Sequence, residues 1–164
     1  MAKILLVSDN NEQNLRIEQT LKKLALAVIV CTDEKEILNY AEKSLVSLII
    51  VDDAVKSLDA LILCKKLPSY TVKENICVLS LVDADTTNQE ILKLTTSYVT
   101  KPLNDLILGS CVLSNLKLKK AVDTLSMNNS ELAKSLYQLD VLYNTSTQLA
   151  GSLDKQKLIN IMID

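Results

Sequence analysis

Hydrophobic and polar residues alternate in blocks along the first two thirds of the chain. Short apolar runs, typical of buried strands, are separated by segments in which apolar residues recur at helical spacing. The runs that predict strands are 3–7, 27–31, 46–51, 76–81 and 97–100. The segments that predict helices are 12–24, 33–44, 58–67 and 86–94, with a further helix beginning near Asn104.

This alternation predicts an α/β fold in which a parallel sheet is covered by helices on both faces. Right-handed crossovers leave few topologies, and for five βα units they favour the flavodoxin-like strand order 2-1-3-4-5. In such sheets ligands bind at the carboxyl ends of the strands. We therefore expect any functional site at that edge.

The helix that begins near Asn104 continues with a seven-residue repeat of apolar positions. Steps of three and four residues alternate, as in the a and d positions of a coiled coil. The positions that would face a partner helix are Val122, Leu125, Asn129, Leu132, Leu136 and Leu139. Asn129 at an a position favours a parallel homodimer, because its amide can pair with its twin. The alternatives are a helix that folds back onto the first domain and one that meets another domain.

Gly151 suits a helix C-cap, so we expect a helix of roughly 45 residues ending there. The resulting organisation is a domain over 1–115, a coiled-coil helix over 116–150 and the start of a further domain over 151–164. Because the chain ends inside a helical pattern, we expect an output domain downstream.

Composition narrows the functional classes. A formal net charge of -2 gives no basic surface for nucleic acid, and no apolar run approaches the ~20 residues of a membrane span. The N-terminal apolar run is too short for a signal peptide, so a cytoplasmic location is the expectation. The chain has no histidine, which excludes Cys/His zinc sites and catalysis by Ser–His or Cys–His pairs. Its four separated cysteines are expected to be reduced.

Polar residues at four predicted strand ends could form one site. Asp9 and Asp52 follow the first and third strands, Ser80 lies near the end of the fourth, and Lys101 follows the fifth. Two carboxylates can hold Mg²⁺ together with water and phosphate oxygens. Next to a lysine and a hydroxyl, one of these carboxylates could act as a nucleophile for phosphoryl transfer.

Four motifs resemble the receiver domains of two-component response regulators: KILLVSD at 3–9, LIIVDDAVKSLDA at 48–60, VLS at 78–80 and YVTKP at 98–102. The resemblance implies a non-enzymatic module that accepts a phosphoryl group from a histidine kinase or phosphotransfer protein. The roles that it implies are phosphoacceptor for Asp52, Mg²⁺ ligands for Asp9, Asp52 and the Ala54 carbonyl, phosphoryl contact for Lys101 and Ser80, and conformational switch for Ser80 and Tyr98. It also implies a cis peptide bond before Pro102.

The sequence departs from this family's pattern at several positions. Ser8 stands where a second acid is usual, so we expect Mg²⁺ to be held weakly. Lys56 and Ala60 replace a usual proline and glycine. These departures leave open a phosphorylation-independent pseudo-receiver that acts as a dimerisation scaffold. A flavin or nucleotide binder is disfavoured, because there is no glycine-rich phosphate loop.

Three further interpretations concern single segments. Asp9 taken alone would cap the helix that follows it. Asp53 is expected to be solvated, because strand alternation points it away from Asp52. The last segment, from Leu142, loosely resembles the opening of GAF-type sensory domains.

Overall fold

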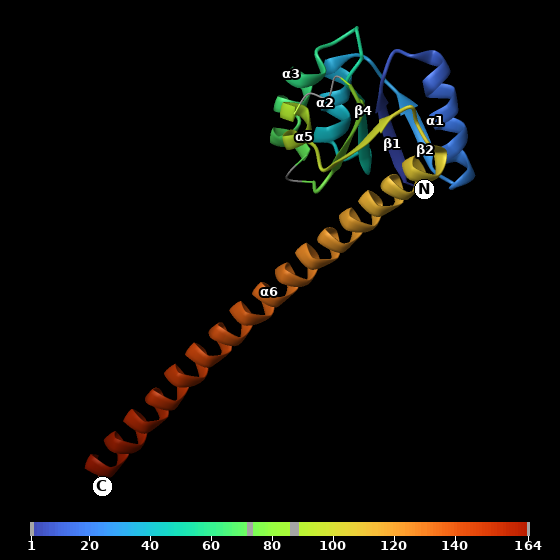
Figure 1. Ribbon diagram of the computed structural model, residues 1–164. Coiled ribbons are helices and arrows are strands. Elements are labelled where there is room, and N and C mark those ends of the chain that lie inside the picture. The colour runs from blue at the N-terminus through green and yellow to red at the C-terminus, as the bar shows by residue number, and fades with distance from the viewer. Residues whose placement is uncertain (1, 72–73, 86–88, 164) are drawn as a thin grey trace. The chain divides into compact units, whose positions relative to one another are not determined.

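A computed structural model describes residues 2–71, 74–85 and 89–163 of the chain (Figure 1). Its centre is a five-stranded, all-parallel sheet with the order β2-β1-β3-β4-β5. The strands are β1 (Lys3–Val7), β2 (Ala27–Val30), β3 (Leu48–Asp52), β4 (Cys77–Asp83) and β5 (Ser97–Lys101). The expected fold class and strand order are confirmed.

A helix follows each strand as expected, with small shifts at the helix ends, and the short helix α4 between α3 and β4 is an addition to the expected pattern. They are α1 (Asn11–Lys23), α2 (Glu34–Glu42), α3 (Ala60–Lys66), α4 (Pro68–Thr71), α5 (Gln89–Leu94) and α6 (Asp105–Ile163). The third helix starts later than expected, because Asp59 caps it by accepting hydrogen bonds from the N–H groups of Leu61 and Ile62. Pro68 opens the short helix α4, which suits a residue without an N–H group. The expected helix start at 86–88 lies outside the described residues.

The sheet separates two hydrophobic clusters, because neighbouring residues of a strand point to opposite faces. On β1, Leu5 and Val7 belong to the cluster covered by α2, α3 and α5, whereas Ile4 and Leu6 belong to the cluster covered by α1 and the first part of α6. Gly109 lets α6 approach the end of α1, since a Cβ there would lie 3.3 Å from Leu24 Cδ1. Both faces of the central strands are thus closed, and polar groups concentrate at the strand ends.

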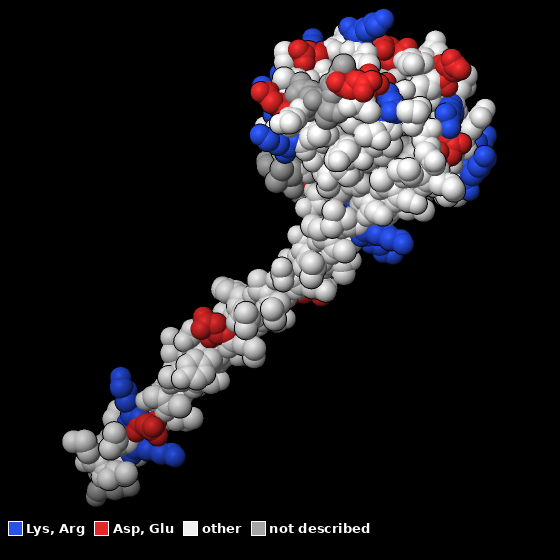
Figure 2. Space-filling view, viewed as in Figure 1, with Lys and Arg blue, Asp and Glu red and all other residues white. Residues whose placement is uncertain are grey.

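The chain divides into two compact units, Met1–Val122 and Asp123–Asp164. The described residues of the second unit all belong to α6, and their side chains are exposed except for that of Asp123, which is half-buried. On the face shown in Figure 2 it carries few charged side chains, whereas both signs of charge are interspersed over the first unit. Among the described residues, no helix combines the length and the hydropathy needed to cross a bilayer.

The expected helix end at Gly151 is wrong. The helix α6 has 59 residues and continues through Gly151 to Ile163 without a break before the segment that resembles a GAF-type domain. A single glycine costs a helix about 1 kcal/mol relative to alanine, and good helix formers on both sides offset that.

Within the described residues, three turns place a residue other than glycine at positive φ. These residues are Ala25 (φ 58°), Ser44 (φ 50°) and Asn75 (φ 52°). Ser44 follows α2 in a Schellman-type ending, in which the N–H of Leu45 donates to the carbonyl of Tyr40 at 3.1 Å. Because the chain has no glycine before Gly109, side-chain-bearing residues carry the strain of these turns.

We predict that Ser44→Gly raises the free energy of unfolding by about 0.5–1 kcal/mol, because glycine adopts this conformation without steric cost. The matched control is Ser114→Gly, at an exposed position within α6. That change should lower the free energy of unfolding by about 0.5 kcal/mol. Urea denaturation of both variants measures the effect, and a destabilised Ser44→Gly would contradict the assignment of strain.

Candidate functional site

Asp52 is a buried carboxylate at the end of β3, with a side chain that accepts four hydrogen bonds. The residue is 3% exposed. Its Oδ1 accepts from Lys101 Nζ at 2.5 Å and from the Ala54 N–H at 3.0 Å. Its Oδ2 accepts from Gln13 Nε2 at 2.7 Å and from Ser8 Oγ at 3.2 Å. Donors from four different segments therefore converge on the residue that the sequence singled out.

Lys101 is the cation of the site. Besides Asp52, its Nζ lies 3.1 Å from Asp53 Oδ1 and 3.8 Å from Asp83 Oδ1. Burial lowers the pKa of Lys101, but its hydrogen bonds and charge interactions with Asp52 and Asp53 outweigh that effect and raise the pKa above 10.5. The carboxylates around this ammonium group outnumber it, which leaves excess negative charge.

The expectation that Asp53 is solvated is wrong. Its side chain is 9% exposed and forms an ion pair with Lys101. Asp53 Oδ2 also accepts a hydrogen bond from the Asp83 N–H at 3.3 Å. Because β3 ends at Asp52, strand alternation no longer governs where the next side chain can reach.

Asp9 lies at the same edge but faces the loop after β3. Its Oδ2 accepts hydrogen bonds from the N–H groups of Lys56 at 2.8 Å and Ser57 at 3.0 Å. The Lys56 hydrogen bond is the largest contribution to the lowered pKa of Asp9. The alternative in which Asp9 caps the following helix is wrong, because the N-cap is Asn10, with its Oδ1 accepting from the Gln13 N–H at 3.2 Å.

The two expected switch residues lie side by side on neighbouring strands. Ser80 and Tyr98 are register partners between β4 and β5. Ser80 is fully buried, and its Oγ lies 3.2 Å from Thr95 Oγ1. Tyr98 is 53% exposed, so its ring is turned outward. Ser80 thus has a hydroxyl partner other than Asp52 in this structure.

The donor set at this edge fits a hard divalent cation. Asp9 and Asp52 could supply carboxylates, and the Ala54 backbone could add a carbonyl oxygen, which is the ligand chemistry that Mg²⁺ prefers. The excess negative charge around Lys101 points the same way. No group of three or more Asp, Glu, Cys or His side chains that could hold a metal occurs within the described ranges, so water would complete such a site.

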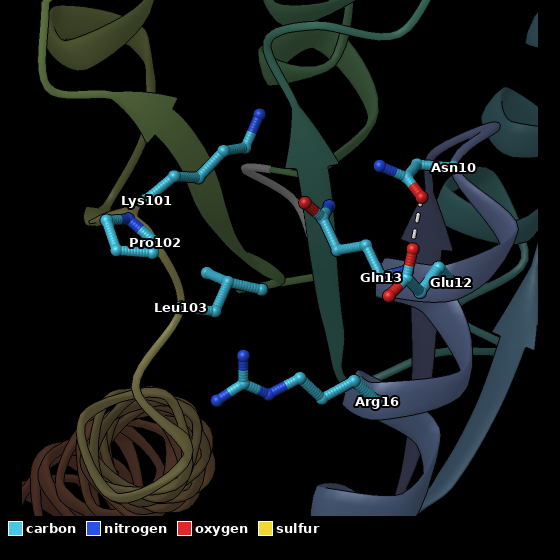
Figure 3. A pocket seen from close by; sticks show the side chains of 7 residues that line it. All are labelled: Asn10, Glu12, Gln13, Arg16, Lys101, Pro102 and Leu103. Atoms are coloured by element: carbon cyan, nitrogen blue, oxygen red, sulfur yellow. Dashed lines mark hydrogen bonds between the residues drawn. The ribbon is translucent and has the colours of Figure 1, made fainter.

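A pocket of about 290 Å³ lies beside Lys101, between α1 and the segment after β5. Figure 3 shows Gln13 and Arg16 reaching into it from α1, opposite Lys101 and Leu103. Arg16 Nε also forms an ion pair with Asp105 Oδ1 at 2.8 Å. Gln13 therefore lies between the pocket and Asp52.

Solved structures provide a comparison for the first unit. No family model matches the chain, and no curated protein matches it either. A two-component response regulator from Clostridium difficile has 20% identity, a TM-score of 0.61 and coverage of 71% of this chain and 97% of its own. The Vibrio cholerae chemotaxis protein CheY4 has 24% identity, a TM-score of 0.59 and coverage of 70% and 98%. The fold is that of a receiver domain.

The same fold also occurs in a chain named as adenylate cyclase from Rhodopirellula baltica. Its identity is 21%, its TM-score is 0.65, and the match covers 76% of this chain and 93% of that one. At these identities the likeness concerns the receiver fold alone. The Lys101–Pro102 peptide bond is cis, as the resemblance implied.

Gln13 is a site residue that the sequence analysis missed. It stands in the first turn of α1, and only its side-chain conformation brings its amide to Asp52. A sequence signal does exist, since a polar residue in the first turn of the helix that follows β1 must lie near the sheet edge. The sequence cannot say which partner such an amide takes.

We predict that Lys101→Met lowers the free energy of unfolding by about 3–5 kcal/mol at pH 7, because it leaves buried carboxylates without a cation. The matched control is Lys66→Met, which breaks the exposed ion pair with Glu34 and should cost about 0–1 kcal/mol. Denaturant titration measures both variants. A loss in the free energy of unfolding that is equally small in both variants would contradict the role of Lys101 as the cation that stabilises the buried carboxylates.

The pH dependence follows from the raised pKa of Lys101. The stability that this ion pair contributes is fully present below 10.5, the ordinary lysine value, and is lost as pH rises through the higher pKa of the folded state. The difference in the free energy of unfolding between wild type and Lys101→Met, measured by denaturant titration, should therefore become smaller at strongly alkaline pH.

Proposed function

We propose that the first unit is a two-component receiver module that accepts a phosphoryl group on Asp52. The observation that carries this proposal is the 2.5 Å contact between Lys101 Nζ and Asp52 Oδ1 at the carboxyl edge of the sheet. A carboxylate held beside a lysine, with a backbone N–H from Ala54, is arranged for nucleophilic phosphoryl transfer. The phosphoryl donor would be a histidine kinase or a phosphotransfer protein.

In the transfer, an Asp52 oxygen forms a bond to phosphorus as the bond between phosphorus and the donor's nitrogen breaks. Lys101 supplies a positive charge beside the attacking carboxylate and can pair with an oxygen of the phosphoryl group. Asp9, Asp52 and the Ala54 carbonyl would hold Mg²⁺, which, when bound, neutralises charge on the phosphoryl oxygens. The module is an acceptor and does not itself turn over a substrate.

Ser80 and Tyr98 would report the modification. The phosphoryl group adds about two negative charges at the strand ends. Ser80 can answer by exchanging its Thr95 partner for a phosphoryl oxygen, which opens space for the outward-turned Tyr98 ring. The surface around α5 and β5 would change as a result.

We propose further that α6 forms a parallel homodimer that transmits this change to an output domain. Leu125, Leu132, Leu136 and Leu139 are 61%, 59%, 58% and 62% exposed in the single chain. Together with Val122 and Asn129 they follow the a and d spacing along one helix. Burial of these leucines against a second copy removes apolar surface from water, which favours association.

One observation favours the second candidate function, a phosphorylation-independent dimerisation scaffold. Both Asp52 oxygens already accept hydrogen bonds within the chain, and Ser8 provides a hydroxyl where the resemblance leads one to expect an acid. A carboxylate satisfied in this way can serve as a structural ion-pair partner. The two candidates differ in whether Asp52 takes a covalent group.

We predict that incubation with Mg²⁺ and a small acyl phosphate adds one phosphoryl group, seen by intact mass spectrometry. Asp52→Asn should abolish the gain, because the amide is not a nucleophile here. Asp53→Asn, a neighbouring variant with the same chemical change, should retain it. Absence of any adduct at saturating donor, also with beryllofluoride, would favour the scaffold.

For the helix, we predict a dimer in sedimentation experiments on the whole chain. Leu125→Asp should produce a monomer, because it places a charge in the apolar seam. Ser126→Asp, one position outside the seam, should remain dimeric, and Asn129→Leu should tighten the dimer while loosening its register. A wild-type monomer, or a dimer indifferent to Leu125→Asp, would rule out this helix pair.

A further inference from the structure

Gln13 and Lys101 donate hydrogen bonds to different oxygens of Asp52, Gln13 to Oδ2 and Lys101 to Oδ1. Gln13 Nε2 donates to Asp52 Oδ2 at 2.7 Å, which is shorter than the 3.2 Å contact of Ser8 Oγ with the same atom. Hydrogen bonds to an ionised acceptor are shorter and stronger than neutral ones. The amide of Gln13 is therefore the main neutral partner of Asp52 Oδ2.

The position of Gln13 on α1 is fixed by its backbone, whereas its side chain has room to move. The backbone N–H donates to the N-cap Asn10, which anchors the first turn of the helix. The side chain, however, also lines the pocket of about 290 Å³ beside Leu103 and Pro102 (Figure 3). A glutamine amide that turns away from Asp52 can enter this pocket without a change in the helix.

We propose that Gln13 is an internal competitor that keeps Asp52 closed to Mg²⁺ and to phosphoryl donors until its side chain withdraws into the adjoining pocket. This inference rests on the proposed phosphoacceptor function of Asp52. A metal ion and an amide N–H cannot both bind the same lone pairs of Oδ2, since the amide presents a partial positive charge to them. Gln13 is thus a positioning residue that sets how readily Mg²⁺ and phosphoryl donors reach Asp52.

The asymmetry between the two Asp52 oxygens supports this assignment. Oδ1 is held by Lys101 and by the Ala54 backbone, partners that are compatible with a charged phosphoryl group nearby. Oδ2 is held by two uncharged side chains that lie on the α1 side of the site. Of these, Ser8 is buried and cannot move far, so Gln13 is the group that can be exchanged.

The test measures cation binding directly, without relying on phosphorylation. Mg²⁺ binding to the whole chain is followed by isothermal titration calorimetry, with Mn²⁺ electron paramagnetic resonance as a second readout. Gln13→Ala should tighten binding about ten- to hundredfold, the range expected for removal of one competing hydrogen bond to a charged group. Gln13→Leu, which keeps the side-chain bulk but lacks the donor, should also tighten it.

Gln19→Ala is the matched control, because Gln19 is an exposed glutamine of the same helix. It should leave Mg²⁺ affinity unchanged, and Asp52→Asn should weaken Mg²⁺ binding in every background. Equal affinity of wild type and Gln13→Ala, including no binding by either, would overturn the inference. Tightening in Gln13→Ala but not in Gln13→Leu would also overturn it, because bulk rather than the amide would then be the obstacle.

Failure of the proposed function gives a different pattern. If acyl phosphate and beryllofluoride leave Asp52 unmodified in both wild type and Gln13→Ala, the phosphoacceptor role fails. Tighter Mg²⁺ binding in the same Gln13→Ala sample would still support competition at Oδ2. If both proposals hold, the initial rate of beryllofluoride adduct formation should rise in Gln13→Ala at low Mg²⁺.

Discussion

The ammonium group of Lys101 stabilises the buried carboxylates at the carboxyl edge of the sheet. Lys101 forms ion pairs with Asp52 and Asp53, which otherwise would be two adjacent, nearly buried negative charges without a cation. The penalty for burying an unpaired charge is several kcal/mol, so the end of β3 could not close around Asp52 without it. The sheet register sets this geometry, because β5 pairs with β4 so that Lys101 lies opposite Asp83. Fold and candidate site therefore depend on the same strand alignment.

The fold could be predicted from the sequence because its determinants are local and repetitive. Strands such as β1 and β3 are continuous apolar runs, and polar residues mark where each run ends. For the same reason Asp9, Asp52 and Lys101 could be placed at one edge. Side-chain conformation could not be predicted: the direction of Asp9 depends on loop N–H groups, and the amide of Gln13 on a contact between helix and strand. The length of α6 was underestimated because a glycine is a weak stop signal in otherwise good helical sequence.

Ser80, in β4, is linked to the helical layer through the hydroxyl group of Thr95. Thr95 Oγ1 contacts Ser80 Oγ and also donates to the carbonyl of Ile91 within α5. The next residue, Thr96, uses its Oγ1 to accept from the Val78 N–H. A displacement of Ser80 would thus remove a hydrogen-bond partner of the Thr95 hydroxyl, just after the end of α5. The position of Ser80 in β4 is therefore coupled to the end of α5 through Thr95.

The scarcity of glycine has a consequence for the unfolded chain. An average sequence of this length has about 7% glycine, whereas this chain has 2 glycines in 164 residues. Each glycine replaced by a residue with a side chain reduces the conformational entropy of the denatured ensemble, by about 0.4–1 kcal/mol in free energy. The lower entropy of the denatured state therefore offsets the backbone strain at Ala25, Ser44 and Asn75. Part of the free energy of unfolding therefore comes from the low conformational entropy of the unfolded chain.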